Sequence, residues 1–441
     1  MKYGLIGHPL GHSYSKVIHG FFGNDAYEIC DLAPSRLADF FAAPDFCGVN
    51  VTIPHKKAVM PYCELSEAAR RIGSVNTIVK RGGALLGYNT DYAGFLYLAR
   101  CADISFSGQK VIILGSGGTS RMAALAALDC GARAVVTLSR GATGDGTRSH
   151  PCDKIRGEIL GCRAEMDSYQ NIARHADADI LINTTPVGMY PHNAGLPPVL
   201  DALPRLSAVI DVIYNPGKTR LVLEAEKRGI RAVGGLPMLV AQAYYANELF
   251  FDHAATGAGT HDTAPSPVAE IELALQKAQR LFANIVLIGM PGSGKTTLGR
   301  ALAKRLGLRF VDTDEEIAAR AGKPPADIIT ERGETAFRRL ESDVVFEIAK
   351  ENGCVIATGG GSVLAEQNRD ALRQNGTVLF VDRALSRLAT EGRPLSLNTD
   401  ALEVMAGARR PIYEAMCDAR LSISENFHGD LATLLEIAGR D

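Results

Sequence analysis

The sequence predicts an α/β protein in which helices cover parallel sheets that are divided between domains. Short apolar strands alternate with helical stretches, as where Val111–Leu114 precedes a helix at Arg121–Leu128 and a strand at Ala134–Leu138. The same alternation predicts further strands at Ile180–Ile182, Val209–Val212, Ile285–Ile288, Arg309–Val311, Val355–Ala357 and Val378–Val381. A chain of 441 residues is too long for one core, so roughly three domains are expected.

Composition and charge limit the class of protein. Hydrophobic residues make up 46% of the chain and charged residues 22%, as in ordinary soluble proteins. The net charge of −2 does not favour nucleic acid or an anionic membrane as a partner. No signal peptide and no apolar run of about 20 residues is present. The nine cysteines are scattered without a Cys-x-x-Cys pair, so we expect reduced thiols in a cytoplasmic protein.

A break in the alternation marks a boundary between two parts of the chain. Ala254–Glu270 is rich in Gly, Ala, Thr and Pro and has no apolar period, which predicts a linker. Pro265 and Pro267 are expected to stiffen its end. A partial apolar stripe over Ile271–Phe282 then predicts a helix.

The second part begins with a phosphate-binding loop. Gly289–Thr296 reads GMPGSGKT, which fits G-x-x-x-x-G-K-[ST] between a strand at Asn284–Ile288 and a helix at Leu298–Leu306. Its glycines let backbone N–H groups turn toward phosphate oxygens, Lys295 reaches the outer phosphates of ATP, and Thr296 ligates Mg²⁺. The predicted nucleotide-binding residues are Gly289, Gly292, Gly294, Lys295, Thr296 and Thr297. A plain Gly-rich turn is the alternative interpretation.

Acids and arginines that follow this loop indicate an anionic substrate. Asp312 and Asp314 end a strand and, on an extended segment, can both face its carboxyl edge. Gly359–Gly361 follows another strand and lets a substrate approach the backbone closely. Three segments contribute arginines, namely Arg338 near Glu341, Arg393, and Arg409 with Arg410. Each arginine alone is typical of a solvated surface charge.

Residues 284–441 resemble shikimate kinase. They carry the P-loop, D-T-D, F-R-R-x-E, G-G-G, R-P-L and R-x-P-x-Y in the family's order. The resemblance implies a P-loop NTPase fold of the nucleoside monophosphate kinase type. It implies that Asp314 binds the acceptor hydroxyl and takes its proton, and that Asp312 reaches Mg²⁺ through water. It also implies that Arg409 and Arg338, which Glu341 holds, bind the substrate carboxylate. Gly360 would contact the substrate through its backbone, and Arg393 would act from a lid. This lid is short, and Arg387 is a weak candidate for a further lid arginine.

The first part contains a second glycine-rich turn. Gly115, Gly117 and Gly118 lie between a strand and a helix as G-x-G-G-x-S, which departs from the strict dinucleotide motif G-x-G-x-x-G. The next strand ends at Ser139-Arg140 without the acid that binds the ribose of NAD. Arg140 therefore favours NADP, although a solvated loop arginine would look the same.

A lysine and an aspartate upstream can form an acid/base pair. The segment Gly48–Lys57 brings Asn50 and Lys56 to the polar end of a short strand. Two segments, Gly73–Thr77 and Gly87–Asp91, are predicted loops with polar side chains. Lys56 can donate a proton to a nascent alkoxide while Asp91 orients it. In the simpler interpretation both are surface charges.

Residues 2 to about 251 resemble shikimate dehydrogenase. The motifs are GHSYS, NVTIPHK, GSVNT, GYNTDYAG, GSGGTS, INTTPVGM, DVIYNPGKT and GLPMLVAQA, in the family's order. The resemblance implies that Lys56 and Asp91 are catalytic and that Asn183 and Thr184 border the nicotinamide. The implied substrate-binding residues are Ser13, Ser15, Asn50, Thr52, Asn76, Tyr214 and Gln242. Lys16 and the turn Ser139-Arg140-Gly141 depart from the family's pattern.

Together the two resemblances predict a bifunctional enzyme of aromatic amino acid biosynthesis. It would reduce 3-dehydroshikimate to shikimate with NADPH and then phosphorylate shikimate to shikimate 3-phosphate with ATP and Mg²⁺. The expected domains are a substrate domain (1–100 and 238–253), a Rossmann-like NADP-binding domain (101–237), a linker and helix (254–283) and the P-loop kinase (284–441). A quinate-type dehydrogenase fused to another small-molecule kinase is one alternative. In another, one half serves only as a binding or regulatory module.

Overall fold

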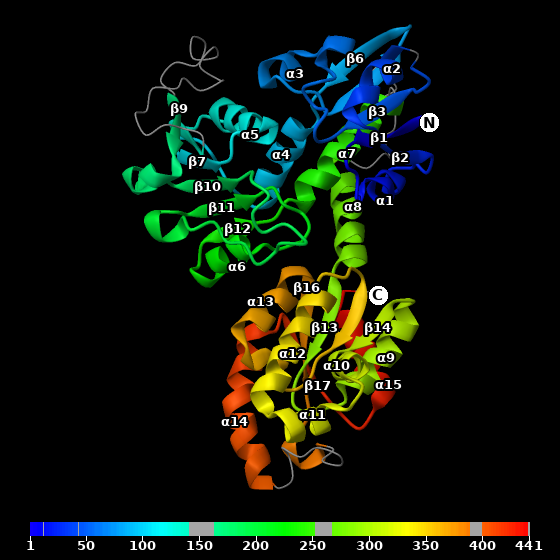
Figure 1. The fold of residues 1–441 in the computed structure, drawn as a ribbon, viewed down its shortest axis with the longest axis vertical. Helices are drawn as coiled ribbons and strands as arrows, with labels where there is room; N and C mark the ends of the chain where they lie inside the picture. The colour runs from blue at the N-terminus through cyan, green and yellow to red at the C-terminus, as the bar shows by residue number, and fades with distance from the viewer. Residues whose placement is uncertain (12, 43, 141–162, 252–266, 389–398, 440–441) are drawn as a thin grey trace. The chain divides into compact units, whose positions relative to one another are not determined.

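The structure, a computed structural model, describes residues 1–11, 13–42, 44–140, 163–251, 267–388 and 399–439. They form two compact units (Figure 1): Met1–Tyr214 with Leu221–Ala278, and Asn215–Arg220 with Gln279–Asp441. The first unit contains two sheets and the second contains one. None of the helices in the described ranges is both long enough and apolar enough to cross a membrane.

The first sheet of the first unit is mixed. Its strands lie in the order β2 (Tyr27–Asp31), β1 (Tyr3–Gly7), β3 (Gly48–Val51), β5 (Thr77–Arg81), β6 (Ala84–Tyr88) and β4 (Glu64–Leu65). β5 pairs antiparallel with β3 and β6, so this sheet differs from the parallel sheets that the strand–helix alternation further along the chain predicts. Gly82 and Gly83, with φ angles of 53° and 88°, close the tight β5–β6 turn. Part of each predicted loop is also regular structure, because Thr77 begins β5 and Gly87–Tyr88 ends β6.

The second sheet is parallel throughout its described strands. Their order is β12 (Arg231–Val233), β11 (Ala208–Asp211), β10 (Ile180–Asn183), β7 (Lys110–Leu114), β8 (Ala134–Ser139) and β9 (Arg163–Ser168). The predicted strands of this region are therefore confirmed. From β7 the chain passes to β8 on one side and returns to β10 on the other. Parallel sheets bind ligands beyond the carboxyl ends of strands at such a reversal.

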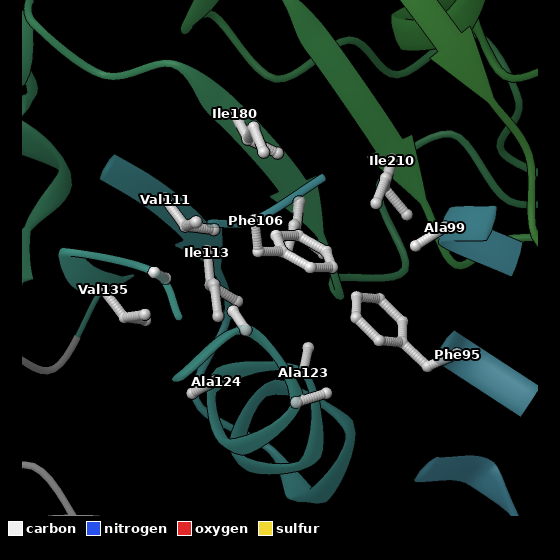
Figure 2. Close-up of a cluster of buried hydrophobic side chains, with 14 of the residues drawn as sticks. Phe95, Ala99, Phe106, Val111, Ile113, Ala123, Ala124, Val135, Ile180 and Ile210 are labelled. Carbon is white, nitrogen blue, oxygen red and sulfur yellow. The ribbon is translucent and has the colours of Figure 1, made fainter. Parts of the chain in front are cut away.

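Helices bury both faces of the second sheet. The helices of this unit are α1 (Ser15–Phe21), α2 (Leu37–Ala42), α3 (Glu67–Ile72), α4 (Asp91–Cys101), α5 (Gly118–Asp129), α6 (Arg220–Lys227) and α7 (Leu236–Phe251). Val111 and Ile113 of β7 pack with Ala123 and Ala124 of α5 and with Phe95 of α4 (Figure 2). The alternate residues of β7 enter a separate cluster on the opposite face. Burial on both faces explains why this strand is apolar throughout.

The second unit is built on one parallel sheet. Its strands lie in the order β14 (Arg309–Asp312), β15 (Cys354–Ala357), β13 (Asn284–Ile288), β16 (Gly376–Asp382) and β17 (Ala419–Ser422). Its helices are α9 (Lys295–Leu306), α10 (Thr313–Ala321), α11 (Pro325–Arg332), α12 (Glu334–Ile348), α13 (Glu366–Asn375), α14 (Thr399–Met416) and α15 (Phe427–Ile437). Ile285 and Leu287 face α9 and α15, whereas Val286 and Ile288 face α12 and α13. The central position of β13 places the loop after it in the middle of the sheet edge.

The predicted linker is only partly a linker. Helix α8 spans Pro267–Phe282, so the helix begins four residues before the predicted Ile271. Pro267 is the first helical residue, where a proline loses no hydrogen bond and its fixed φ suits the helix. The preceding part of the expected linker, including Pro265, lies outside the described residues.

Candidate active sites

Lys56 and Asp91 meet within the first unit. Lys56 lies in the turn after β3, and Asp91 is the first residue of α4. The Lys56 Nζ lies 2.5 Å from the Asp91 Oδ2, and the side chains are 23% and 13% exposed. A partly buried carboxylate offsets the cost of burying the ammonium and fixes its direction. The predicted pair is present, and its role in catalysis stays a prediction.

Two asparagines predicted to hold the substrate lie behind this pair. The Asn76 Oδ1 accepts the Thr90 N–H at 2.7 Å, and its Nδ2 donates to the Thr90 Oγ1 at 3.0 Å. The Asn50 Nδ2 donates to the Asn76 carbonyl at 3.3 Å and to the Thr77 Oγ1 at 3.0 Å. The Asn50 Oδ1 accepts from the Tyr27 hydroxyl at 2.7 Å. Asn50 is only 4% exposed and its amide is engaged on both sides, and its role in binding the substrate stays a prediction.

Half-buried hydroxyls that were predicted to hold the substrate follow β1 and β3 along the chain. The Ser13 Oγ accepts the Ser15 N–H at 3.2 Å and lies 3.0 Å from the Ser15 Oγ. Between them, the ring of Tyr14 lies 5.6 Å from the ring of Tyr214, whose hydroxyl pKa is raised by burial. Thr52 is half-buried directly after β3. Neutral hydroxyls of this kind can hydrogen-bond a carboxylate or a sugar-like alcohol.

Gln242 lies on α7 where that helix crosses α4. A Cβ at Gly94 would lie 2.7 Å from the Met238 carbonyl oxygen and 3.0 Å from the Gln242 Cβ. Only glycine therefore allows the two helices to approach this closely. Because Asp91 precedes Gly94 by one helical turn, the crossing brings the helix segments of Asp91 and Gln242 together. The Gln242 Nε2 donates to the Leu239 carbonyl at 2.9 Å.

The glycine-rich turn of the first unit lies at the reversal of the second sheet. Gly115 follows β7 with φ of 104°, and a Cβ there would lie 2.8 Å from the Thr184 Oγ1. Thr184 follows β10 and donates to the Leu114 carbonyl at 2.6 Å. At Gly117, the residue capping α5, a Cβ would have no described atom within 4 Å. An open backbone at a helix N-terminus fits the pyrophosphate of a dinucleotide.

Asn183 and Arg140 differ in their access to this crevice. Asn183 is completely buried, and its Nδ2 donates to the Asp211 Oδ1 at 3.0 Å. It therefore joins β10 to β11, and the expectation that it borders the nicotinamide stays a prediction. Arg140 is exposed at the end of β8, where its charge opposes the upward effect of burial on the pKa of Tyr169. An exposed guanidinium there fits a 2′-phosphate, and the rest of its turn, from Gly141, lies outside the described residues.

In the second unit, Gly289–Thr296 joins β13 to α9. The φ angles are 146°, 80° and 99° at its glycines, Gly289, Gly292 and Gly294. The Lys295 Nζ donates to the carbonyls of Gly289 and Met290 at 2.9 Å each. The Ser293 Oγ is buried, with no hydrogen-bond partner among the described residues. A buried cation and an unsatisfied hydroxyl in a loop of this conformation fit a phosphate chain.

Thr296 and Asp312 meet beside this loop. The Thr296 Oγ1 donates to the Asp312 Oδ2 at 2.7 Å, and Thr297 follows as an exposed residue of α9. The Asp312 Oδ1 accepts the Asp314 N–H at 2.9 Å and so caps α10. Asp314 is thus in the first turn of a helix, not on the predicted extended segment. A hydroxyl and a carboxylate oxygen together fit Mg²⁺, which prefers oxygen ligands.

The glycine run after β15 touches three parts of the predicted site. A Cβ at Gly359 would lie 2.7 Å from the Asp314 Oδ1, and one at Gly360 would lie 2.6 Å from the Pro291 Cδ of the phosphate-binding loop. A Cβ at Gly361 would overlap the guanidinium of Arg338. Any side chain here would displace an acid, the loop or an arginine, so the run gathers all three around one backbone segment.

The two predicted clamp arginines are held from different directions. The Arg338 Nη1 donates to the Glu341 Oε2 at 2.8 Å, as predicted, and its Nη2 donates to the Glu334 Oε1 at 3.0 Å. Burial lowers the pKa of Arg338, but these glutamates outweigh it and the net pKa is raised. Arg409 is 8% exposed on α14. Burial raises the pKa of Tyr413 to about 12, against the nearby charges of Arg409 and Arg338.

The lid prediction is largely outside the described residues. Arg393 falls there, within 389–398. Arg387 is described, and its Nη2 donates to the Glu425 Oε1 at 2.8 Å in an exposed ion pair.

Several supporting residues were not predicted. The Thr313 Oγ1 accepts the Gly359 N–H at 2.8 Å, and the Ser362 Oγ donates to the Glu341 Oε1 at 2.6 Å. The Tyr413 hydroxyl donates to the Gly360 carbonyl at 2.5 Å. Thr313 and Tyr413 lie inside the motifs D-T-D and R-x-P-x-Y, so the motifs already contained the signal that could have identified them.

Family models match both parts of the chain. The model described as "Shikimate kinase" matches residues 291–435, and the model described as "Shikimate dehydrogenase substrate binding domain" matches residues 5–78. The curated "Shikimate dehydrogenase (NADP(+))" of Caldanaerobacter subterraneus subsp. tengcongensis is 35% identical over 263 residues. That alignment covers 57% of this chain and 92% of the relative.

Solved structures resemble the first part. A crystal structure of shikimate dehydrogenase 1 from Peptoclostridium difficile aligns with a TM-score of 0.52 at 31% identity, covering 63% of this chain and 98% of that one. A chorismate mutase/shikimate 5-dehydrogenase fusion protein from Clostridium acetobutylicum aligns with a TM-score of 0.53 at 30% identity, covering 63% and 96%.

Proposed function

The chain belongs to the shikimate dehydrogenase family and carries a shikimate kinase domain, and from this premise we propose that it catalyses two consecutive reactions. The first reduces 3-dehydroshikimate to shikimate with NADPH. The second phosphorylates shikimate to shikimate 3-phosphate with ATP. The observation that carries the proposal is that one chain holds both a partly buried Lys–Asp pair and a phosphate-binding loop, with Arg338 against the same glycine run that meets the loop. The proposal includes the domain limits of the sequence analysis, which the three separate sheets support.

In the reductase, Lys56 is proposed to deliver the proton. NADPH, when bound beside Gly115 and Thr184, supplies the hydride. The Lys56 ammonium then donates to the oxygen of the former ketone while Asp91 keeps it oriented, as the 2.5 Å contact supports. Further contacts proposed for the substrate come from Ser13, Ser15, Thr52, Asn76, Tyr214 and Gln242. Arg140 is proposed to bind the 2′-phosphate, which favours NADPH over NADH.

In the kinase, Asp314 is proposed to bind and deprotonate the acceptor hydroxyl. Its carboxylate lies against Gly359, on the same glycine run that Arg338 contacts, so one substrate can reach both. Arg338 and Arg409 are proposed to bind the substrate carboxylate, and Gly360 to contact the substrate through its backbone. Mg²⁺, when bound by Thr296 and, through water, by Asp312, neutralises phosphate charge. Lys295 exchanges its carbonyl partners for the phosphates, and Arg393 is proposed to neutralise the transferring phosphoryl group.

Identification of the products tests both steps. The full chain receives 3-dehydroshikimate, NADPH, Mg²⁺ and ATP, and the products are identified by mass spectrometry. We expect shikimate 3-phosphate with all components, shikimate alone without ATP, and no product without NADPH. Quinate with NAD serves as a competing substrate pair. Faster oxidation of quinate with NAD than of shikimate with NADP would contradict the reductase assignment, and accumulation of unphosphorylated shikimate with ATP present would contradict the kinase assignment.

A further inference from the structure

A chain of buried polar side chains begins at Tyr27 and crosses the first sheet. Tyr27 on β2 is completely buried, and its hydroxyl donates to the Asn50 Oδ1 on β3 at 2.7 Å. Because the Asn50 oxygen faces Tyr27, the Asn50 Nδ2 must point the other way. It donates to the Thr77 Oγ1 on β5 at 3.0 Å. The Asn50 Nδ2 also donates to the Asn76 backbone carbonyl at 3.3 Å, and because a carbonyl only accepts, this contact fixes which way round the Asn50 amide lies.

The chain of polar side chains continues to Thr90, the residue before Asp91. Since Thr77 accepts from Asn50, its own hydrogen is left to donate to the Asn76 Oδ1, 3.0 Å away. The same Asn76 oxygen accepts the Thr90 N–H at 2.7 Å. Thr90 is the N-cap residue of α4, and Asp91, the first residue of the helix, follows it directly. The Asn76 oxygen is thus held by the Thr90 N–H and the Thr77 hydroxyl together. The Thr77 Oγ1 also lies 3.2 Å from the Thr90 Oγ1, where either hydroxyl can donate, so a shift of Thr77 bears on the start of α4 at two points.

Tyr27 itself is held by a rigid polar support. The ring of His19 on α1 stacks on it with centroids 3.8 Å apart and planes 10° apart. The His19 Nδ1 lies 3.1 Å from the Asn247 Oδ1 of α7, which also accepts from the Asn24 Nδ2 at 2.9 Å. Burial lowers the pKa of His19 to about 4, so the ring is neutral at pH 7 and donates through Nδ1 to the Asn247 oxygen. The Tyr27 ring therefore has little freedom to move the end of its hydroxyl.

We infer that Tyr27 is a positioning residue for the reductase, whose hydroxyl, acting through Asn50, Thr77, Asn76 and Thr90, holds Asp91 in register with Lys56. This inference rests on the proposed roles of Lys56 and Asp91. Tyr27 touches neither residue, and it lies on β2, an edge strand of the sheet. Its removal changes the alignment of the pair and leaves the charges of the pair in place.

Tyr27→Phe tests the inference in the full chain. We expect kcat of the reductase to fall about tenfold, with the NADPH KM and the kinase rate unchanged, because one directional hydrogen bond is lost. Thr77→Val, which breaks the chain at a second point, should reproduce the loss, and Thr77→Ser, which keeps the hydroxyl, should not. In an Asp91→Asn background Tyr27→Phe should have almost no further effect, since the two residues act through one interaction.

Tyr3→Phe is the matched control. Tyr3 is another buried tyrosine of the first sheet, and among the described residues its hydroxyl donates to the Phe250 carbonyl at a long 3.5 Å. It should leave kcat unchanged. The inference is overturned if Tyr27→Phe alters kcat no more than Tyr3→Phe does, or if its effect is fully additive with Asp91→Asn. If Asp91→Asn and Lys56→Met both retain full reductase activity, the proposed pair itself is wrong, which is a separate result.

Discussion

The two units hold their central lysines in opposite ways. The Lys56 Nζ lies 2.5 Å from a carboxylate oxygen, and the Lys295 Nζ donates to two backbone carbonyls of its own loop at 2.9 Å. A charged partner is suited to a lysine that stays in one position and transfers a proton. Neutral carbonyls are suited to a lysine that must exchange its partners for a more strongly charged phosphate. The difference teaches that the first site is organised around an ion pair that persists, and the second around backbone hydrogen bonds that a phosphate can replace.

The residues that position the two sites also differ, because a polar network supports the first site and close contacts with glycines support the second. Behind Asp91 lies a network of buried amides and hydroxyls, with a neutral His19 at its far end. In the second unit, Asp314 and Arg338 instead lie against glycines, where the absence of a side chain sets their place. Polar networks respond to lost hydrogen bonds and to pH, whereas close approaches respond to added volume.

Replacing each lysine in turn is expected to have the largest effect and to separate the two activities. Lys56→Met should lower reductase activity by about 10²–10⁴-fold, the usual contribution of general acid catalysis, and leave the kinase unchanged. Lys295→Met should remove most kinase activity and leave the reductase unchanged, because the phosphates lose a buried cation. Separate assays of each reaction check this. Loss of both activities from either change would refute two independent sites.

Acid should destabilise the first unit through His19. Its pKa is lowered by burial from 6.5 to about 4, so the folded chain resists a proton that the unfolded chain accepts. The stability is complete above pH 6.5 and falls as the pH drops toward 4, by about 3 kcal/mol. Thermal inactivation of the reductase, measured from pH 7 to 4, checks this against His19→Gln. A variant with the same pH dependence as the wild type would show that His19 is not the responsible group.

Added volume should damage the kinase site. Gly361→Ala places a methyl group where the Arg338 guanidinium lies, so the shikimate KM of the kinase should rise about 10- to 100-fold. The reductase rate should not change. Gly407→Ala is the matched control, because a Cβ at this exposed position of α14 meets no described atom within 4 Å. An unchanged KM for Gly361→Ala would show that Arg338 does not bind the substrate.

The smallest expected effect comes from one hydroxyl. Tyr413→Phe removes the 2.5 Å hydrogen bond to the Gly360 carbonyl and should weaken shikimate binding by about 1 kcal/mol, or several-fold in KM. The ATP KM should stay the same, since the phosphate-binding loop keeps its own contacts. Steady-state kinetics with each substrate varied in turn check this. A change in the ATP KM alone would place the role of Tyr413 at the nucleotide instead.

The sequence predicted the parallel sheets and the residue pairs that depend on short motifs. Apolar runs such as Val111–Leu114 have no alternation because both faces are buried, which is a signal local to the strand. The pairing of Lys56 with Asp91 and of Arg338 with Glu341 also followed from motifs whose residues stay together in the fold. The conformation of the loop at Gly289–Thr296 is likewise local, because its glycines set it.

Features that depend on long-range contacts were not predictable in this way. The antiparallel β5–β6 pair and the helical position of Asp314 depend on hairpin and capping geometry that a strand pattern does not contain. Whether Asn50 and Asn183 face a ligand or the interior depends on partners far along the chain, Tyr27 and Asp211. Their residue type suits either role, so the motif alone could not decide.

Helix α7 is made long after the sheet against which it packs. Phe250 stacks on Tyr3 with ring centroids 5.3 Å apart and fills the space beside Gly48, and Asn247 joins His19. While the chain is being synthesised, the first sheet therefore has no α7 to pack against until about residue 250 has left the ribosome. The strands of the second sheet are contiguous in sequence and need no such wait. The second sheet is thus able to fold before the first sheet, although the first sheet begins earlier in the sequence. During that interval a nascent chain exposes its N-terminal strands to chaperones.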